Sequence, residues 1–167
     1  MNKINIRLAT LFDKNAINEL FIQMIKFVNN QNKKQGVIVD EELFKNGYEE
    51  GYLDEFFASS NKCIVVAELD SKVIGYLSII YYTNENNSYL YLDDFCVDSN
   101  YRNRGIGTKL IEWIINYAKE NDFDNLKLHV DANNIKALSF YNKLGFIPLN
   151  LNKGRIEMYK KVLNKRK

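Results

Sequence analysis

The chain has 167 residues, of which 46% are hydrophobic and 26% charged, and a formal net charge of +2. This length and composition are typical of one soluble globular domain, so we predict a single domain over residues 1–167. The small charge does not indicate a nucleic-acid partner, and no apolar window reaches the roughly 20 residues of a membrane span. Because the start lacks an apolar leader, we expect a cytoplasmic protein with no membrane partner; a homodimer stays open.

The first predicted elements are a strand and a helix. Residues 4–9 alternate polar and apolar side chains, which is typical of a strand. Apolar side chains then recur at helical spacing from Ala16 to Val28, behind two candidate N-cap residues, Thr10 and Asp13. The polar run 29–36 lacks this spacing, so we expect the helix to end there.

A second helix is predicted between residues 40 and 57, where aromatic and apolar side chains again share one side. Gly47 and Gly51 favour a break or bend in it. The stretch is strongly acidic, because Lys45 is its one base among seven acids. These acids are Asp40, Glu41, Glu42, Glu49, Glu50, Asp54 and Glu55.

Three strands follow in the middle of the chain, over residues 63–68, 73–82 and 89–97. Short turn-like links, 69–72 and 83–88, join them. Links this short allow only antiparallel neighbours, because a parallel pair needs a longer crossover.

The last part of the chain predicts helix, strand, helix and two closing strands. Residues 106–120 are strongly amphipathic, and residues 126–130 alternate as a strand. Asn133 or Asn134 would cap the next helix, and Gly145 would end it. The closing strands are predicted over residues 146–149 and 155–163.

This order of elements predicts an α+β fold, an α/β/α sandwich. Its seven-stranded sheet would be mixed and mostly antiparallel, with about four helices against it. The helix 106–120 would connect the fourth and fifth strands as a parallel crossover requires.

The fourth strand carries a predicted irregularity. Its large apolar side chains fall on even positions at Leu90 and Leu92 and then on odd positions at Phe95 and Val97. Period-two alternation cannot shift in this way without an extra residue. We therefore predict a bulge at Asp93–Asp94 that splays the sheet and leaves backbone N–H groups unpaired.

A basic, glycine-broken loop joins this strand to the following helix. Gly105 and Gly107 remove Cβ atoms where an anion must approach, and the unpaired amides of the helix start would bind it. It is not a P-loop, because Thr108 precedes Lys109, nor a dinucleotide loop, because a third glycine is absent. The loop reads Arg102, Asn103, Arg104, Gly105, Ile106, Gly107 and Thr108.

The spacing Arg-x-x-Gly-x-Gly, after a strand that carries carboxylates, resembles the acetyl-CoA-binding segment of the GNAT superfamily of N-acetyltransferases. A second segment matches it, with Asn134, Ala137, Phe140-Tyr141 and Gly145-Phe146 at the same spacing. Together the two segments cover about a third of the chain, and the resemblance implies a GNAT-like sheet splayed at its fourth strand. The N-terminal third matches only in element order.

The resemblance implies acetyl-CoA as cosubstrate, with its diphosphate on the loop. Its pantetheine arm would pair with the backbone of Phe95, Cys96 and Val97, and the amide of Phe95 or Cys96 would polarise the thioester carbonyl. The Asn134 side chain would contact the pantetheine or the diphosphate, and Ala137 would lie against the cofactor.

The same resemblance implies three catalytic candidates. Asp93 takes the place of a carboxylate that serves as base, through a water because aspartate is short, and Asp94 is the neighbouring candidate. Alternatively, both acids only stabilise the bulge or attract a cation. Tyr141 would lie on the cofactor near its sulfur as general acid, because a phenol with a pKa of about 10 keeps its proton at neutral pH.

No metal site is predicted. Cys63 and Cys96 lie in strands and are expected to be buried free thiols, and neither has metal-ligand spacing. The single histidine, His129, lies between Leu128 and Val130, so we expect it to be packed and hydrogen-bonded rather than catalytic.

The function predicted first is direct acetyl transfer to a primary amine in a ternary complex. The acids between residues 40 and 55 favour a small cationic amine as partner. A peptide N-terminus or a lysine is the alternative acceptor. Two other functions stay open, a non-catalytic acyl-CoA-binding module and a nucleotide-binding protein, the second disfavoured by the missing third glycine.

Overall fold

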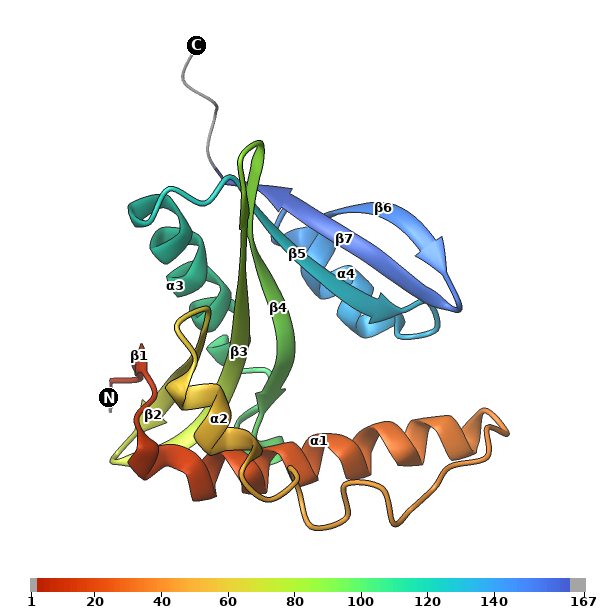
Figure 1. Cartoon of the computed structure of the whole chain (residues 1–167). Coiled ribbons are helices and arrows are strands. Elements are labelled where there is room, and N and C mark those ends of the chain that lie inside the picture. The colour runs from red at the N-terminus through yellow and green to blue at the C-terminus, as the bar shows by residue number, and fades with distance from the viewer. Residues whose placement is uncertain (1–2, 163–167) are drawn as a thin grey trace.

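The computed structural model describes residues 3–162, and its elements form a seven-stranded sheet with helices on both faces (Figure 1). The strand order is β1-β2-β3-β4-β5-β7-β6; β4 and β5 are parallel and every other pair is antiparallel. This arrangement confirms the predicted fold. The strands are β1 (Asn5–Leu8), β2 (Lys62–Leu69), β3 (Lys72–Asn84), β4 (Asn87–Val97), β5 (Asn125–Asp131), β6 (Ile147–Asn152) and β7 (Arg155–Lys161). The α-helices are α1 (Lys14–Lys34), α2 (Tyr52–Ala58), α3 (Ile106–Glu120) and α4 (Ile135–Lys143).

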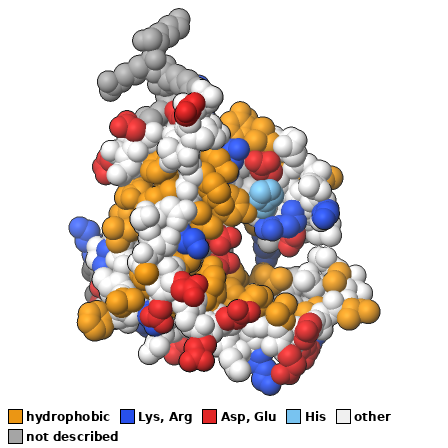
Figure 2. All heavy atoms as spheres, viewed as in Figure 1, with side chains coloured by type: hydrophobic (Ala, Val, Ile, Leu, Met, Phe, Trp, Pro, Cys, Tyr) orange, Lys and Arg blue, Asp and Glu red, His pale blue; other side chains and the backbone are white. Residues whose placement is uncertain are grey.

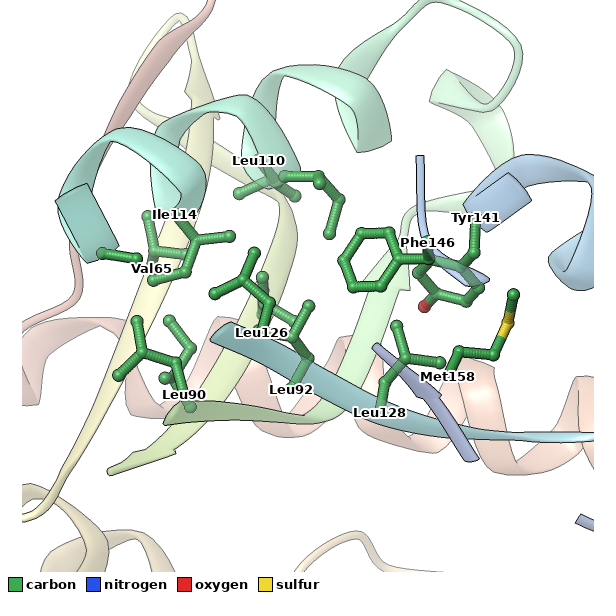
Figure 3. Packing of buried hydrophobic residues seen from close by; sticks show 14 of the residues in the cluster. Val65, Leu90, Leu92, Leu110, Ile114, Leu126, Leu128, Tyr141, Phe146 and Met158 are labelled. Carbon is green, nitrogen blue, oxygen red and sulfur yellow. The ribbon is translucent and has the colours of Figure 1, made fainter. Parts of the chain in front are cut away.

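Two clusters of buried side chains hold the layers together. On one face of the sheet, Leu110 and Ile114 of α3 pack over Leu90 and Leu92 of β4, and Phe146 joins them after α4 (Figure 3). The helical spacing of α3 and the even-numbered alternation of β4 make these side chains meet.

The opposite face of the sheet is covered by α1 and α2. Ile17 and Phe21 of α1 and Phe56 of α2 pack over Ile64 of β2 and Tyr76 of β3. This second cluster contains no residue of β5, β6 or β7, so α1 and α2 cover only the half of the face formed by the first strands.

Among residues 3–162, no α-helix has both the length and the apolar character of a membrane span.

The predicted bulge in β4 is present. Leu77 of β3 pairs with Phe95 and Ile79 pairs with Leu92, so the single residue Ser78 lies opposite both Asp93 and Asp94. The parallel pairing of β4 with β5 covers Tyr89 to Leu92 only. Beyond the bulge the two strands separate, and the sheet opens between them.

The first half of the chain differs from the prediction in two places. The helix predicted to end at Val28 continues to Lys34, because the polar run contains no glycine or proline before Gly36 and places two lysines at the negative end of the helix dipole. The helix predicted over residues 40–57 is confined to α2. Phe44, Gly47 and Gly51 have φ values of 57°, 96° and 82°, which a right-handed helix cannot contain.

The C-terminal elements follow the prediction closely. Asn134 is the N-cap of α4, and Gly145 follows the helix with a φ of 83°. The strand predicted over 146–149 is β6, which begins one residue later and continues to Asn152. The last predicted strand is β7, and its predicted end at Leu163 lies outside the described residues.

Candidate functional site

A pocket of about 510 Å³ opens where β4 leaves the sheet and the glycine loop enters α3. The loop contributes most of its wall, Phe95 and Val97 of β4 line one side, and Phe140 of α4 lines another. The volume is in the range of small-molecule sites. The loop residues that line it are Tyr101, Arg102, Asn103, Gly105, Ile106, Gly107 and Thr108.

Gly105 and Gly107 are each required in the loop, but for different physical reasons. Gly105 adopts a φ of +75°, and a Cβ there would meet nothing within 4 Å, so its backbone conformation requires glycine and the space beside it is open. A Cβ on Gly107 would come within 3.1 Å of the Phe95 ring and 3.3 Å of the Phe140 ring. Gly107 therefore lets these two aromatic side chains lie against the first turn of α3.

The start of α3 presents unpaired donors to this pocket. The first helical bond in α3 runs from the Lys109 N–H to the Gly105 carbonyl at 3.1 Å. The amides of Ile106, Gly107 and Thr108 precede it and have no partner within the helix, and all three residues line the pocket. Such amides, at the positive end of a helix dipole, can bind a phosphate group.

The three cations of the predicted phosphate site, Arg102, Arg104 and Lys109, do not all line the pocket. Arg102 lines it, donates from Nε to the Val97 carbonyl at 3.0 Å and lies over the Phe27 ring. Arg104 is exposed and lies over the Tyr101 ring at 5.3 Å. Neither Arg104 nor Lys109 lines the pocket. Arg102 is therefore the one cation of the loop at the pocket wall, and Arg104 lies next to the wall because it contacts the ring of Tyr101, which lines the pocket.

The backbone of β4 can be assigned to its two sides. The Asp94 N–H donates to Ser78 Oγ of β3 at 2.8 Å, and the Asp98 N–H donates to the Ile74 carbonyl of β3 at 2.9 Å. Successive N–H groups of a strand point to opposite sides. The N–H groups of Phe95 and Val97 therefore face the opening between β4 and β5, and that of Cys96 faces β3.

The bulge places both acids on the face covered by α1 and α2. Asp94 is partly buried and accepts a hydrogen bond from the Tyr48 hydroxyl at 2.6 Å. Loss of solvation raises the pKa of Asp94 from 3.8 to about 6; the Tyr48 hydrogen bond opposes this rise and the charge of Asp93 adds to it. Asp93 is more exposed, and desolvation raises its pKa against the charges of Arg155 and Lys62. The pKa of Asp94 is thus shifted toward the neutral range.

Tyr141 lies behind the pocket rather than on its wall. It is 9% exposed, with the rings of Phe95, Phe140 and Phe146 around it, and its oxygen lies among the carbon side chains of the cluster (Figure 3). The hydroxyl makes no hydrogen bond with any described residue, and burial raises its pKa. It therefore keeps its proton through the neutral range.

Asn134 and Ala137, the other residues at the start of α4 that were predicted to contact the cofactor, make contacts within the fold. The Asn134 side-chain oxygen accepts from the Ala137 N–H at 3.1 Å and so caps the helix. Ala137 is partly buried against the cluster that α3 and α4 share. Neither residue lines the pocket, and nor does Cys96, whose buried thiol donates to the Leu20 carbonyl of α1.

Two residues of the pocket wall were not predicted as site residues. Tyr101 and Phe140 line the pocket, and the aromatic residue that precedes Tyr141 was the available signal for Phe140. His129 is exposed rather than packed, although it is hydrogen-bonded, since its Nδ1 lies 2.9 Å from the Tyr91 hydroxyl. The parallel register that brings β4 beside β5 could not be read from either strand alone.

The surface on this side of the sheet is hollowed (Figure 2). Acidic side chains lie inside the hollow, and basic side chains and the histidine follow its upper rim (Figure 2). Asp94 and Phe95 are adjacent residues of β4, so their side chains lie on opposite faces of the sheet, with Phe95 on the wall of the pocket at the glycine loop.

The strand that opens beside the glycine loop, the unpaired amides at the start of α3 and the acids on the other face of β4 are the features that an acyl-CoA-dependent acyltransferase would require. The chain belongs to the acetyltransferase (GNAT) family, since the model of that family matches residues 36–146. The matched region includes β4, the loop, α3 and α4. The resemblance inferred from the sequence is confirmed.

Two relatives illustrate how far the likeness extends. The chain is 33% identical over 112 residues to streptothricin acetyltransferase A of Bacillus subtilis (strain 168), which covers 64% of the chain and 63% of that protein. It is 36% identical over 99 residues to the probable N-acetyltransferase san of Drosophila melanogaster, covering 57% and 54%. The matches thus span less than two thirds of either relative.

Solved structures of similar fold cover nearly the whole chain. PaiA N-acetyltransferase from Thermoplasma acidophilum, in complex with coenzyme A, has a TM-score of 0.78 at 21% identity, over 95% of this chain and 99% of that one. The ribosomal-protein-S18-alanine N-acetyltransferase from Escherichia coli has a TM-score of 0.68 at 17% identity, over 96% and 94%. These likenesses establish the fold.

Proposed function

We propose that the protein is an acetyl-CoA-dependent N-acetyltransferase that transfers the acetyl group directly to a primary amine in a ternary complex. The observation that carries this proposal is the position of β4 between two half-sites. Phe95 and Val97 border the pocket at the glycine loop, and Asp93 and Asp94 lie on the other face. A cofactor held on one side and an amine on the other would meet at the opening.

The pocket residues would hold the cofactor by its diphosphate and its arm. The amides of Ile106, Gly107 and Thr108, together with Arg102, offer donors and charge for the diphosphate. The Phe95 and Val97 N–H groups would pair with the pantetheine arm. The coenzyme A bound by the PaiA structure supports this assignment.

Acetyl-CoA supplies a thioester, and the strand would polarise its carbonyl. Between Phe95 and Cys96, the two donors suggested by the sequence, the N–H direction favours Phe95, because the Cys96 N–H faces β3. A fixed backbone donor at this place stabilises the negative charge that develops as an amine attacks.

Asp94 would accept the proton that the attacking ammonium loses. A pKa of about 6 leaves the carboxylate mostly ionised at pH 7 and more basic than an ordinary aspartate, which suits a general base. Asp93 would contribute charge that attracts the ammonium.

Tyr141 would donate a proton to the departing thiolate. Its hydroxyl keeps its proton at neutral pH because burial raises its pKa, and no described residue competes for that proton. Asn134 and Ala137 would support the cofactor through the start of α4.

We propose a small cationic amine as acceptor, on the strength of Asp93 and Asp94 rather than of the acidic stretch between residues 40 and 55. Three of the acids in that stretch form ion pairs, Glu41 with Lys33, Glu42 with Lys45, and Asp54 with Lys14. Their charges are therefore partly neutralised by bases, two of which lie on α1.

A peptide amine is the second candidate acceptor, because the face of β5 and β7 beside Asp93 is left uncovered by the α1–α2 cluster. The names of two similar proteins support different acceptor classes. One is named for streptothricin, and the other for an alanine of a ribosomal protein.

An acceptor panel tests the function and the acceptor class together. Purified protein is given acetyl-CoA with polyamines, aminoglycosides, lysine or peptides, and free thiol release is measured against an amine-free blank. We expect turnover with a small amine that carries more than one cationic group. Saturable CoA binding without thiol release in the presence of any amine would contradict the proposal and indicate a non-catalytic acyl-CoA-binding module.

A further inference from the structure

Tyr48 reaches the acids from a segment that has no regular secondary structure, residues 36–51. Asn18 of α1 fixes this segment: its Oδ1 accepts from the Tyr48 N–H at 2.8 Å and its Nδ2 donates to the Asn46 carbonyl at 3.2 Å. A Cβ on Gly47 would lie 2.1 Å from Asn18 Oδ1. Only glycine therefore lets the chain approach α1 closely enough to place Tyr48.

The Tyr48 ring is held between two other aromatic rings. It stacks on Phe21 of α1 with centroids 3.8 Å apart and on Tyr52 of α2 with centroids 4.8 Å apart. Rings on both of its faces hold the Tyr48 ring in one orientation. The hydroxyl is thereby aimed at β3 and β4.

A directional chain of hydrogen bonds ends on Asp94. The Tyr48 hydroxyl donates to Asp94 Oδ2 at 2.6 Å and lies 3.0 Å from the Tyr76 hydroxyl. Because Tyr48 has one hydroxyl hydrogen and gives it to Asp94, Tyr76 must donate to Tyr48. The bond to Asp94 engages one carboxylate oxygen.

We propose that Tyr48 is a positioning residue, which orients the Asp94 carboxylate and holds it in the ionised, proton-accepting form. This inference rests on the proposed function for its catalytic meaning, but the hydrogen bond can be tested without catalysis. It makes the segment 36–51, which carries no catalytic group of its own, part of the amine-side machinery.

The pH dependence of Asp94 follows from its surroundings. Burial and the charge of Asp93 raise the pKa of Asp94 to about 6, and the Tyr48 hydrogen bond holds it below the value it would otherwise have. Removal of the Tyr48 hydroxyl should therefore raise it further. The titratable groups that face Asp94 are Tyr76 of β3, Tyr91, Asp93 and Cys96 of β4, Tyr52 of α2, and Tyr48.

Tyr48→Phe keeps the stacked ring and removes the hydroxyl. We expect the acidic limb of kcat/KM for the amine to move up by about one to two pH units, the effect of one lost hydrogen bond to a charged group. CoA affinity should not change. Tyr52→Phe is the matched control, because its ring stacks on Tyr48 while its hydroxyl makes no hydrogen bond with a described residue.

Carbon-13 NMR of the Asp94 carboxyl separates this inference from the proposed function. The titration midpoint of Asp94 should rise in Tyr48→Phe and stay near the wild-type value in Tyr52→Phe, whether or not any amine is acetylated. Asn18→Ala provides a second variant, which frees the segment but keeps both partners, and should move the midpoint in the same direction by less. A midpoint unmoved in Tyr48→Phe and Asn18→Ala, or moved equally by Tyr52→Phe, would overturn the proposal.

Discussion

The two faces of β4 are built in different ways. The side that we propose for the cofactor is made largely from neighbouring residues, since Phe95, Val97 and the loop to Thr108 form most of the pocket wall. On the amine side, Asp94 depends on Tyr48, 46 residues away in the sequence, and on Ser78, 16 residues away. A local site can be read from a motif, whereas a site assembled across elements depends on the whole fold.

The largest effect is expected on the amine side, from Asp94→Asn. Loss of a general base should lower kcat/KM for the amine by about 100-fold at pH 7 and remove the acidic limb near pH 6. CoA affinity, measured by calorimetry, should stay the same. Asp93→Asn is the control and should cost less than about tenfold.

The same variant should stabilise the fold near neutral pH. Because the pKa of Asp94 is raised from 3.8 to about 6, the folded protein holds a proton that the unfolded chain releases in this range, and stability is lost as the pH rises through it. The rise corresponds to roughly 3 kcal/mol. Denaturant unfolding of Asp94→Asn should show a gain above pH 6 that disappears toward pH 3.8. Full activity in Asp94→Asn would move the base to Asp93 or to solvent.

The sequence predicts the bulge and the glycine loop on the pocket side of β4 for a physical reason. The shift from Leu92 to Phe95 in the alternation of β4 requires a bulge, and the bulge is found opposite Ser78. The glycine loop is equally local. The amine side could not be predicted in this way, because Gly47 looks like an ordinary helix breaker until Asn18 is known to occupy the place of its missing Cβ. Tyr48 likewise has no local signal beyond its place among the aromatic side chains of the acidic stretch 40–57.

The next prediction changes only the side of β4 that we propose for the cofactor. Gly105→Val forces a β-branched residue into a φ of +75° and adds methyl groups to the open space that the pocket wall encloses. Strain of about 1–3 kcal/mol in the loop should weaken CoA binding about 10- to 100-fold. The amine face should be unaffected, so the Asp94 titration midpoint should not move.

Gly154→Val is the matched control for backbone strain. Gly154 has a φ of +78° and equally open surroundings, but it lies in the turn between β6 and β7. Both variants should lose similar stability in thermal unfolding, and only Gly105→Val should lose CoA affinity. Equal CoA affinity in the two folded variants would show that the loop does not hold the cofactor.

The smallest effect is expected from Tyr141→Phe, which tests where the two sides meet in the reaction. A thiolate leaves without much help, since an ordinary thiol has a pKa of about 8.5, so a lost proton donor should lower kcat only about tenfold. CoA affinity should hardly change. The Tyr141 hydroxyl makes no hydrogen bond with a described residue, so its removal should also cost no stability, and slower turnover could not be ascribed to unfolding. Single-turnover kinetics should show the loss in the acetyl-transfer step; a wild-type rate there would leave Tyr141 as a packing residue behind Phe95 and Phe140, and would limit the chemistry of the site to the backbone of β4 and the acids on its other face.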